Sequence, residues 1–173
     1  MSKLSTFTLS IVGTLAITFL TAQLPLQARS RTPKACVDRQ PITKRVSLTL
    51  TADKEVITDN IITYQPIEGK ASVKPGDIIR YTVVAKNNSH CPLRNLILKQ
   101  PIPRGTNYLK NSATATKGAQ LLFSIDGGKT FVAEPKIDGQ IAPATAYNYL
   151  RWKFRRPVPT NAQVKTSYKL QVK

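Results

Sequence analysis

Alternating cations near the end of the sequence are the residues best suited to bind a ligand. They occupy two stretches, 147–155 and 164–173, in which apolar residues recur at every second place. The candidate residues are Tyr147, Tyr149, Arg151, Lys153, Arg155, Lys165, Lys169 and Lys173. Arginine can hold a phosphate, sulfate or carboxylate through two parallel hydrogen bonds, and lysine adds a compact positive charge. The pattern therefore predicts a surface that binds an anion or a partner protein.

Two strands are needed to hold these residues together. Leu150, Trp152 and Phe154 alternate with the cations of the first stretch, so a strand there would bury one face and expose the other. If this strand pairs with the second stretch through the turn at 157–161, six cations share one sheet surface. A one-residue slip would expose Trp152, which fixes the register. The alternative is an ordinary solvated strand face.

Groups able to catalyse a reaction are scarce in the sequence. The single histidine, His90, precedes Cys91, but neighbouring side chains point apart, whereas an activated nucleophile must touch its base. A metal site needs three or four converging ligands. Asp53, Glu55 and Asp59 form the only acidic cluster, and a weak calcium loop there is the alternative. We therefore expect no enzyme activity, no cofactor and no metal.

The stretch Ser-Ile-Asp-Gly-Gly-Lys-Thr-Phe, residues 124–131, has the residue order of the aspartate box on the blades of secreted glycosidases. Such boxes recur several times in chains far longer than this one. Asp126 and the two glycines after it supply the carboxylate and the positive-φ residues of a tight hairpin. Ser124 and Thr130 can add side-chain bonds to the backbone. We therefore predict a hairpin turn, with a small exported glycan-acting hydrolase as the alternative.

Residues 1–28 read as a signal peptide. Lys3 is a short basic start, residues 11–20 are mostly apolar, and Pro25 breaks any helix before a cleavage site after Ala28. Ala22 is a second candidate for the cleavage site, and an uncleaved membrane anchor is the alternative. We expect the protein outside the cytoplasm, whether periplasmic, on the cell surface or secreted.

The net charge of +17 is unevenly distributed along the chain. Residues 29–45, a basic arm, hold six Lys and Arg against one acid, and residues 93–173 hold fourteen against three. A one-sided positive field favours anionic partners. For an exported protein these are acidic polysaccharide, other envelope polymers or a surface protein, and nucleic acid is not expected. Solubility in acidic surroundings is the alternative.

Two cysteines are present, Cys36 and Cys91. Disulfides persist outside the cytoplasm, so in an exported protein we expect these two to pair. The closed loop is long, and the bridge would add about 4 kcal/mol on a chain-entropy estimate. It would tie the basic arm to the body of the domain. Two free thiols in a cytosolic protein are the alternative.

Residues 46–173 carry no long helical period but several short alternating stretches, bounded by Pro, Gly and Asn. This rhythm predicts an all-β, immunoglobulin-like sandwich of seven or eight strands, with a small barrel as the rival. Residues 53–72 are ambiguous, and could form an edge strand or an irregular excursion. An exposed edge strand could be exchanged with a partner in an assembly.

Several of these stretches together resemble the bacterial conserved-repeat domain, an immunoglobulin-like family of exported and surface proteins catalogued as a domain of unknown function. The residues that carry the resemblance are Lys74-Pro75-Gly76-Asp77, Tyr81 in the strand that follows, Asn87-Asn88-Ser89, the turn at 101–105, Trp152 and the strand 164–172. It covers about residues 46–173 and implies an exported β-sandwich. Gln100 stands where the family usually has Asp, so any role of that carboxylate does not carry over.

Together these observations predict an exported, non-enzymatic, immunoglobulin-like module of the bacterial cell envelope. Its expected role is structural or adhesive, through contact of a basic sheet face with anionic polymer or a partner protein. A strand-exchanging subunit of a surface complex is the alternative.

Overall fold

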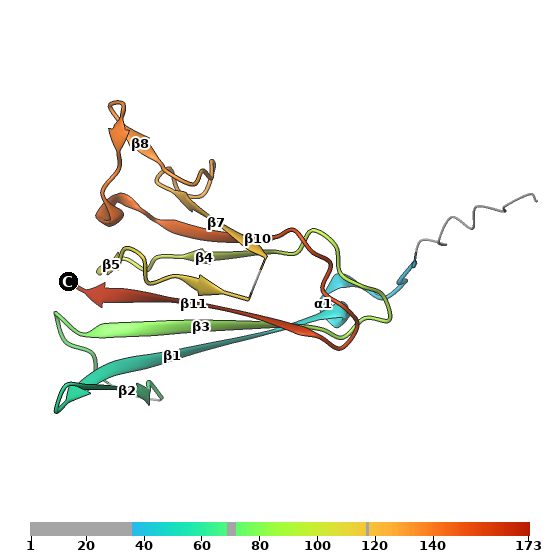
Figure 1. Ribbon diagram of the computed structural model, residues 1–173, viewed down its shortest axis with the longest axis horizontal. Helices are drawn as coiled ribbons and strands as arrows, with labels where there is room; N and C mark the ends of the chain where they lie inside the picture. Colours follow the sequence, from blue (N-terminus) through green and yellow to red (C-terminus); the bar gives the residue numbers. More distant parts are fainter. Residues whose placement is uncertain (1–35, 69–71, 117) are drawn as a thin grey trace, which may run out of the picture. The chain divides into compact units, whose positions relative to one another are not determined.

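The computed structural model describes residues 36–68, 72–116 and 118–173, which fold into two main antiparallel sheets (Figure 1). The predicted signal peptide, residues 1–28, and residues 29–35 of the basic arm lie outside the described residues. One helical turn, α1 (Ile42–Arg45), ends the arm. The expected all-β class is confirmed.

The larger sheet has six strands. They are β1 (Val46–Thr58), β2 (Ile61–Pro66), β3 (Ile78–Asn87), β5 (Thr106–Tyr108), β6 (Thr114–Ala115) and β11 (Gln163–Val172). Their order is β2-β1-β3-β11-β5, and β6 also pairs with β11. The segment 53–72 therefore contributes an edge strand, β2, which was one of the two expectations for it.

The smaller sheet has three strands, β4 (Ile97–Pro101), β7 (Ala119–Ser124) and β10 (Tyr149–Phe154), with β10 in the middle. A short ribbon of β8 (Lys136–Ile137) and β9 (Gln140–Ile141) and a 3₁₀ turn, η1 (Ala144–Ala146), connect β7 to β10. Seven of the eleven strands in the described part have five residues or more, which agrees with the seven or eight that the alternation predicts.

Alternate residues of the two sheets meet in one core. The buried residues that β3, β4, β10 and β11 contribute are Val83, Ala85, Leu98, Leu150, Trp152, Phe154, Val164, Tyr168 and Leu170. Trp152 and Tyr168 come from opposite sheets, and their ring centroids lie 5.7 Å apart. Apolar faces that interdigitate between two sheets define a sandwich, so the expected architecture is confirmed over the barrel.

The last two strands do not form a hairpin, and this prediction was wrong. β10 pairs with β4 and β7, whereas β11 pairs with β3, β5 and β6. Their apolar faces meet across the core. The alternation of a half-buried strand fits this arrangement as well as a hairpin, so it could not decide between the two. The link between them holds Pro157 and Pro159, which cannot donate to a ladder, and Val158 pairs with Leu93 instead.

A single buried asparagine fixes the junction where the chain crosses between the sheets. The amide nitrogen of Asn87 donates to the carbonyls of Cys91, Val158 and Pro159 at 2.9, 3.0 and 3.0 Å. Its carbonyl oxygen accepts hydrogen bonds from the main-chain N–H and the hydroxyl of Ser89. Asn87 thus joins the end of β3, the loop after it and the link from β10 to β11.

The predicted disulfide between Cys36 and Cys91 is confirmed, with a Cα–Cα distance of 5.6 Å. It fastens the arm to the loop that follows β3. Asp38 adds a second tie, because its carboxylate accepts a hydrogen bond from the main-chain N–H of His90. The His90 side chain is exposed beside the bridge.

Candidate anion-binding face

The outer surface of the three-stranded sheet gathers cations from two neighbouring strands. In the antiparallel register Arg151 lies opposite Lys99 of β4 and Leu122 of β7, and paired residues share a face. Lys153 and Arg155 follow at alternate places on or just after β10 and are exposed. We call this surface the basic face: Lys99, Arg151, Lys153 and Arg155, with the aromatic residues Phe131 and Tyr149.

Arg151 has the most constrained cation of the basic face. Its guanidinium carbon lies 3.5 Å from the ring centroid of Phe131, which is a close stacking contact. Its Nε is buried and has no hydrogen-bond partner among the described residues. No ion pair within the described part of the chain includes it either. An arginine that is held flat on a ring and has no acidic partner can bind a planar or tetrahedral oxyanion through its two terminal nitrogens.

Lys99 lies beside Arg151 and is held by the turn at 124–130. Its Nζ donates to the carbonyl of Gly128 at 3.3 Å and lies 4.7 Å from the ring centroid of Tyr149. Gly128 has φ +82°, and a Cβ there would lie 2.7 Å from the Lys99 Nζ. The glycine therefore provides both the positive φ and the space that let the turn close on the lysine.

The turn at 124–130 is the predicted hairpin turn, and Asp126 organises it. The carboxylate accepts hydrogen bonds from the hydroxyl of Thr130 at 2.6 Å, from its N–H at 2.9 Å, and from Ser124 Oγ at 2.7 Å. These bonds, the Thr130 hydroxyl first, hold the pKa of Asp126 far below its ordinary value of 3.8. Phe123 and Val132 then exchange both main-chain bonds, which places Phe131 over the basic face. The motif that resembles an aspartate box thus builds a turn.

The structure divides the predicted site residues between two outer faces. Tyr149, Arg151, Lys153 and Arg155 lie on the basic face, and the Arg155 guanidinium donates to Gln120 at 3.3 Å. Lys165 and Lys169 belong to β11 and lie on the outer face of the six-stranded sheet. The single six-cation surface that we expected does not form, because β10 and β11 are in different sheets.

Two predicted residues have other roles in the structure. Tyr147 turns into the core, where its ring centroid lies 4.6 Å from that of Phe123. Lys169 forms an ion pair with Glu55 at 2.6 Å, and this hydrogen bond raises the pKa of the lysine. Lys169 is therefore already neutralised, whereas Lys165 is exposed.

The carboxylates that form ion pairs lie on the larger sheet or in the turn just before β3. The ion pairs among the described residues join Lys54 to Asp77, Arg80 to Asp53 and Lys169 to Glu55, with distances of 2.7, 2.9 and 2.6 Å. The bond from Lys54 lowers the pKa of Asp77. The calcium loop weighed as an alternative loses two of its carboxylates to these pairs, and no group of three potential metal ligands occurs in the described ranges.

The sequence did not identify Lys99 and Phe131 as site residues. Lys99 carries the signal that marks Arg151, because it is an outward cation in an alternating strand. Phe131 carries no such signal, because only the folded turn brings it over the sheet.

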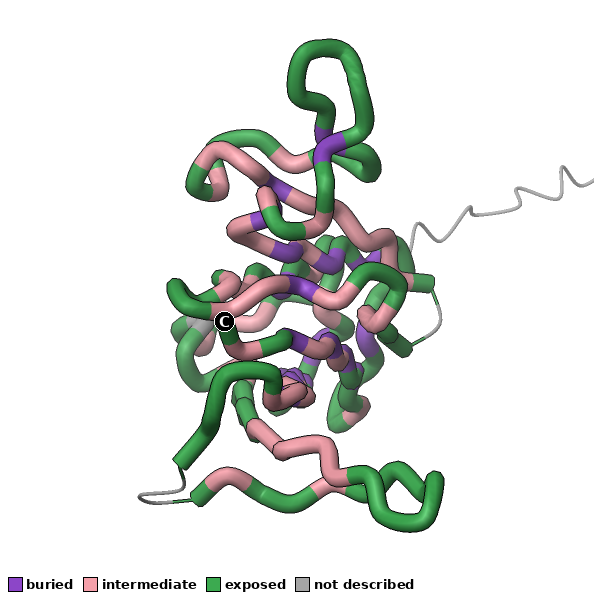
Figure 2. The backbone as a smooth tube through the Cα atoms, turned by 90° about the vertical axis from the view of Figure 1, so that its left-hand side faces the viewer, coloured by how far each residue is buried: buried purple, intermediate pink, exposed green. Residues whose placement is uncertain are grey.

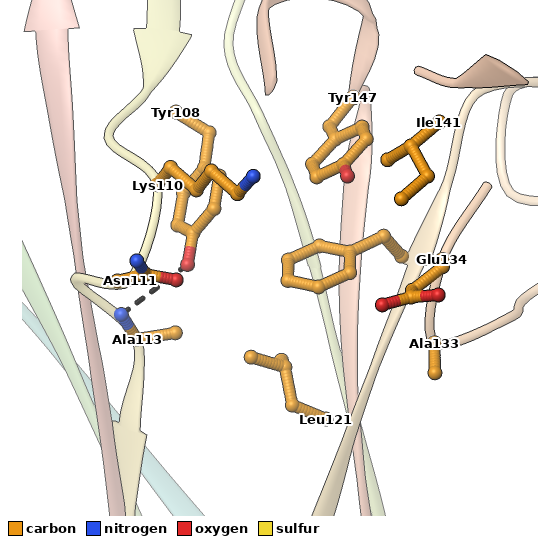
Figure 3. Close-up of a pocket in the computed structure, with 10 residues that line it drawn as sticks. Tyr108, Lys110, Asn111, Ala113, Leu121, Ala133, Glu134, Ile141 and Tyr147 are labelled. Atoms are coloured by element: carbon orange, nitrogen blue, oxygen red, sulfur yellow. Dashed lines mark hydrogen bonds between the residues drawn. The ribbon is translucent and has the colours of Figure 1, made fainter. Parts of the chain in front are cut away.

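A hollow of about 400 Å³ lies beside the core, on the side of β5 and β7 (Figure 3). Tyr108, Phe123 and Tyr147 line its floor, with Lys110 and Glu134 at its rim. The Tyr108 hydroxyl accepts a hydrogen bond from the N–H of Ala113, and burial raises the pKa of this phenol. The hollow pairs one cation with one acid, so it is less suited to an anion than the basic face.

Within the described residues, no helix is both long and apolar enough to cross a membrane. No family model matches the chain, no curated protein matches it, and no solved structure matches it.

Proposed function

We propose that the protein is an exported, non-enzymatic module of the bacterial cell envelope that binds anionic polymer through the basic face. The observation that carries this proposal is the guanidinium of Arg151, stacked 3.5 Å from the Phe131 centroid and without an ion pair among the described residues. A cation held in place and left without a counter-ion is suited to an external anion.

The spacing of the cations favours a repeating ligand. Arg151, Lys153 and Arg155 recur at every second residue, which on an antiparallel strand is a step of about 7 Å. Lys99 on the neighbouring strand widens the row. Acidic polysaccharides present charges at regular intervals along a chain, so several of them can engage this row at once. A single small anion would use only one or two of the cations.

The disulfide supports a location outside the cytoplasm. Such bonds persist in oxidising compartments, and the loop closed by Cys36 and Cys91 spans 55 residues. The predicted signal peptide points to the same compartment, as does the resemblance to the conserved-repeat family of exported proteins. No observation favours the hydrolase alternative, since the hydrogen bonds of the turn already engage the Asp126 carboxylate.

Chromatography on immobilised dextran sulfate tests the proposal. Retention of the protein should fall steeply with added salt, because exposed charges are screened. The triple variant Arg151→Ala, Lys153→Ala, Arg155→Ala should elute at much lower salt than the wild type.

A matched control removes the same charge from other surfaces. Lys86, Lys165 and Lys173 are exposed cations outside the basic face, and changing all three to alanine should shift elution far less. Equal shifts for the two triple variants would mean that net charge alone governs retention, and the proposal would then fail.

A further inference from the structure

Strand β1 has an unpaired edge along its first half. β2 pairs with residues 53–58 of β1, whereas residues 46–52 have β3 on one side and no described strand on the other (Figure 1). Neither strand of the β1–β2 hairpin contains a buried residue, as the green and pink tube of Figure 2 shows.

The main chain of this edge presents hydrogen-bonding groups that no strand in the described part of the chain engages. Asn88 N–H bonds to the Arg45 carbonyl, and Ile67 N–H bonds to the Ala52 carbonyl on the opposite side of β1. Odd-numbered residues of this stretch therefore bond toward β3, because the bonds of an antiparallel strand alternate between its two sides. The N–H and C=O groups of Val46, Leu48 and Leu50 thus point away from β3, into the open edge.

The side chains of the same three residues lie on the inner face of the sheet. Leu48 and Leu50 pair with the core residues Ala85 and Val83, yet they are 61% and 56% exposed. The three-stranded sheet is too narrow to cover them, and Ile97 on its edge strand β4 is 48% exposed. A groove of about 330 Å³ runs along this flank, and its lining is mostly apolar, with Arg94 and Asn95 as the polar members.

This edge lacks the usual protection against pairing with another chain. Residues 46–52 read Val-Ser-Leu-Thr-Leu-Thr-Ala and hold neither a charge nor a proline. Natural sheets usually protect a long free edge with lysine, proline or a bulge. In a chain with a net charge of +17, a neutral and apolar edge of seven residues stands apart from the rest of the surface.

We propose that a second copy of this chain pairs with this edge, antiparallel and with the two-fold axis at Leu48. In this register Leu48 lies opposite its own counterpart, and Val46 lies opposite Leu50 of the partner. Each such pair exchanges two main-chain hydrogen bonds, so all the outward groups of the three residues are satisfied. The axis is perpendicular to the sheet, so both three-stranded sheets lie on one side and jointly cover the leucines.

The charge distribution decides how this dimer responds to salt. The shared surface is one strand edge with few apolar side chains, below about 1,200 Å², which is the size of weak and transient interfaces. The two copies repel each other through their cations, whereas the edge itself is neutral. Added salt should therefore strengthen the dimer, although it weakens anion binding. The two proposals are thus independent and separable.

Sedimentation velocity of the full chain at concentrations up to roughly millimolar, where weak interfaces are populated, tests the pairing. We expect a monomer–dimer equilibrium that shifts toward the dimer as salt is raised. Leu48→Asp should raise the dissociation constant of the dimer by about tenfold or more, since it places two like charges opposite each other. Thr49→Asp adds the same charge on the other face of β1 and should change this dissociation constant less than about threefold.

Cysteine variants test the register without depending on affinity. Cα atoms of a hydrogen-bonded antiparallel pair lie about 5.5 Å apart, within disulfide reach. Leu48→Cys should therefore give a cross-linked dimer on mild oxidation, and Thr49→Cys should not. If sedimentation velocity shows a monomer at every salt concentration, the proposal is overturned, and a strand of another protein becomes the candidate partner for this edge. A dimer unaffected by Leu48→Asp, or equal cross-linking of the two cysteine variants, would also overturn it.

Discussion

The guanidinium carbon of Arg151 lies 3.5 Å from the ring centroid of Phe131, and the two residues come from different elements of the fold. Arg151 is in the middle strand of the three-stranded sheet, and Phe131 follows the hairpin turn after β7. The contact holds a cation on the surface of the sheet without neutralising it. This arrangement separates the basic face from the outer face of the larger sheet, where carboxylates balance Arg80 and Lys169.

Removal of the Phe131 ring should weaken anion binding although the charge of Arg151 is kept. Phe131→Leu keeps an apolar residue over the sheet but removes the π-system that orients Arg151. A cation–π contact of this kind contributes about 0.5–1 kcal/mol, so the affinity for dextran sulfate should fall roughly two- to fivefold. Titration followed by fluorescence anisotropy would measure it. The control is Val132→Ala, an exposed neighbour that should have no effect, and equal effects of both would contradict the role of the ring.

The two glycines of the turn should respond differently to substitution. Gly127 and Gly128 have φ values of +75° and +82°, so alanine at either should destabilise the fold by about 1 kcal/mol. A Cβ at Gly127 meets nothing within 4 Å, whereas one at Gly128 would displace the Lys99 ammonium. Urea unfolding should therefore shift similarly for both variants, and only Gly128→Ala should also lower dextran sulfate affinity. Loss of affinity in both would remove the argument for Lys99.

Asp126 should give the turn a pH-dependent stability. The folded pKa of this carboxyl lies below its ordinary value of 3.8, so its contribution is complete above that value and is lost as the pH falls through the folded pKa. The unfolding free energy of Asp126→Asn should thus lie below that of the wild type near neutral pH. The gap should narrow as the pH falls below 3.8.

Urea titrations of the two proteins across this pH range would measure that gap. Asp138→Asn changes an exposed aspartate in the turn between β8 and β9 and is the control, with little expected effect. A gap for Asp126→Asn that stays constant on acidification would contradict the proposed role of the carboxylate.

Asn87 should be among the residues most important for stability. Asn87→Ala removes three donated bonds and leaves the buried main-chain N–H of Ser89 without its acceptor, which should cost about 3 kcal/mol. Asn88→Ala, at the exposed neighbour, should cost less than about 0.5 kcal/mol. Thermal unfolding of both variants checks this. A similar small effect of the two substitutions would mean that the crossing between the sheets is held mainly by the core.

Alternation of apolar and polar residues was enough to predict most of the fold from the sequence. It marked the strand of Ile78–Asn87 and those that contain Trp152 and Tyr168, while Asp126 and its glycines marked the turn. The partner of each strand could not be predicted in the same way. A half-buried strand shows the same period whether its neighbour in sequence lies beside it or across the core, and for β10 and β11 the second case holds.

The same physical limit explains the errors in the predicted site. Arg151, Lys153 and Arg155 were placed on one face correctly, because a single strand determines that relationship. Lys165 and Lys169 were added through a strand pairing that does not exist. Lys99 and Phe131 were missed because no local pattern places them beside Arg151. The order of strands in the sheet brings Lys99 there, and the folded turn brings Phe131 there.

The affinity of dextran sulfate for the Arg151→Lys variant, measured by calorimetry beside that for Lys165→Ala, tests the central claim most directly. Arg151→Lys keeps the net charge but loses the flat, bidentate donor set, so the affinity should fall about tenfold. Lys165→Ala loses a charge on the outer face of the other sheet and should bind nearly as the wild type does. If Arg151→Lys binds normally while Lys165→Ala binds more weakly, the ligand responds to net charge, and the basic face is not its site.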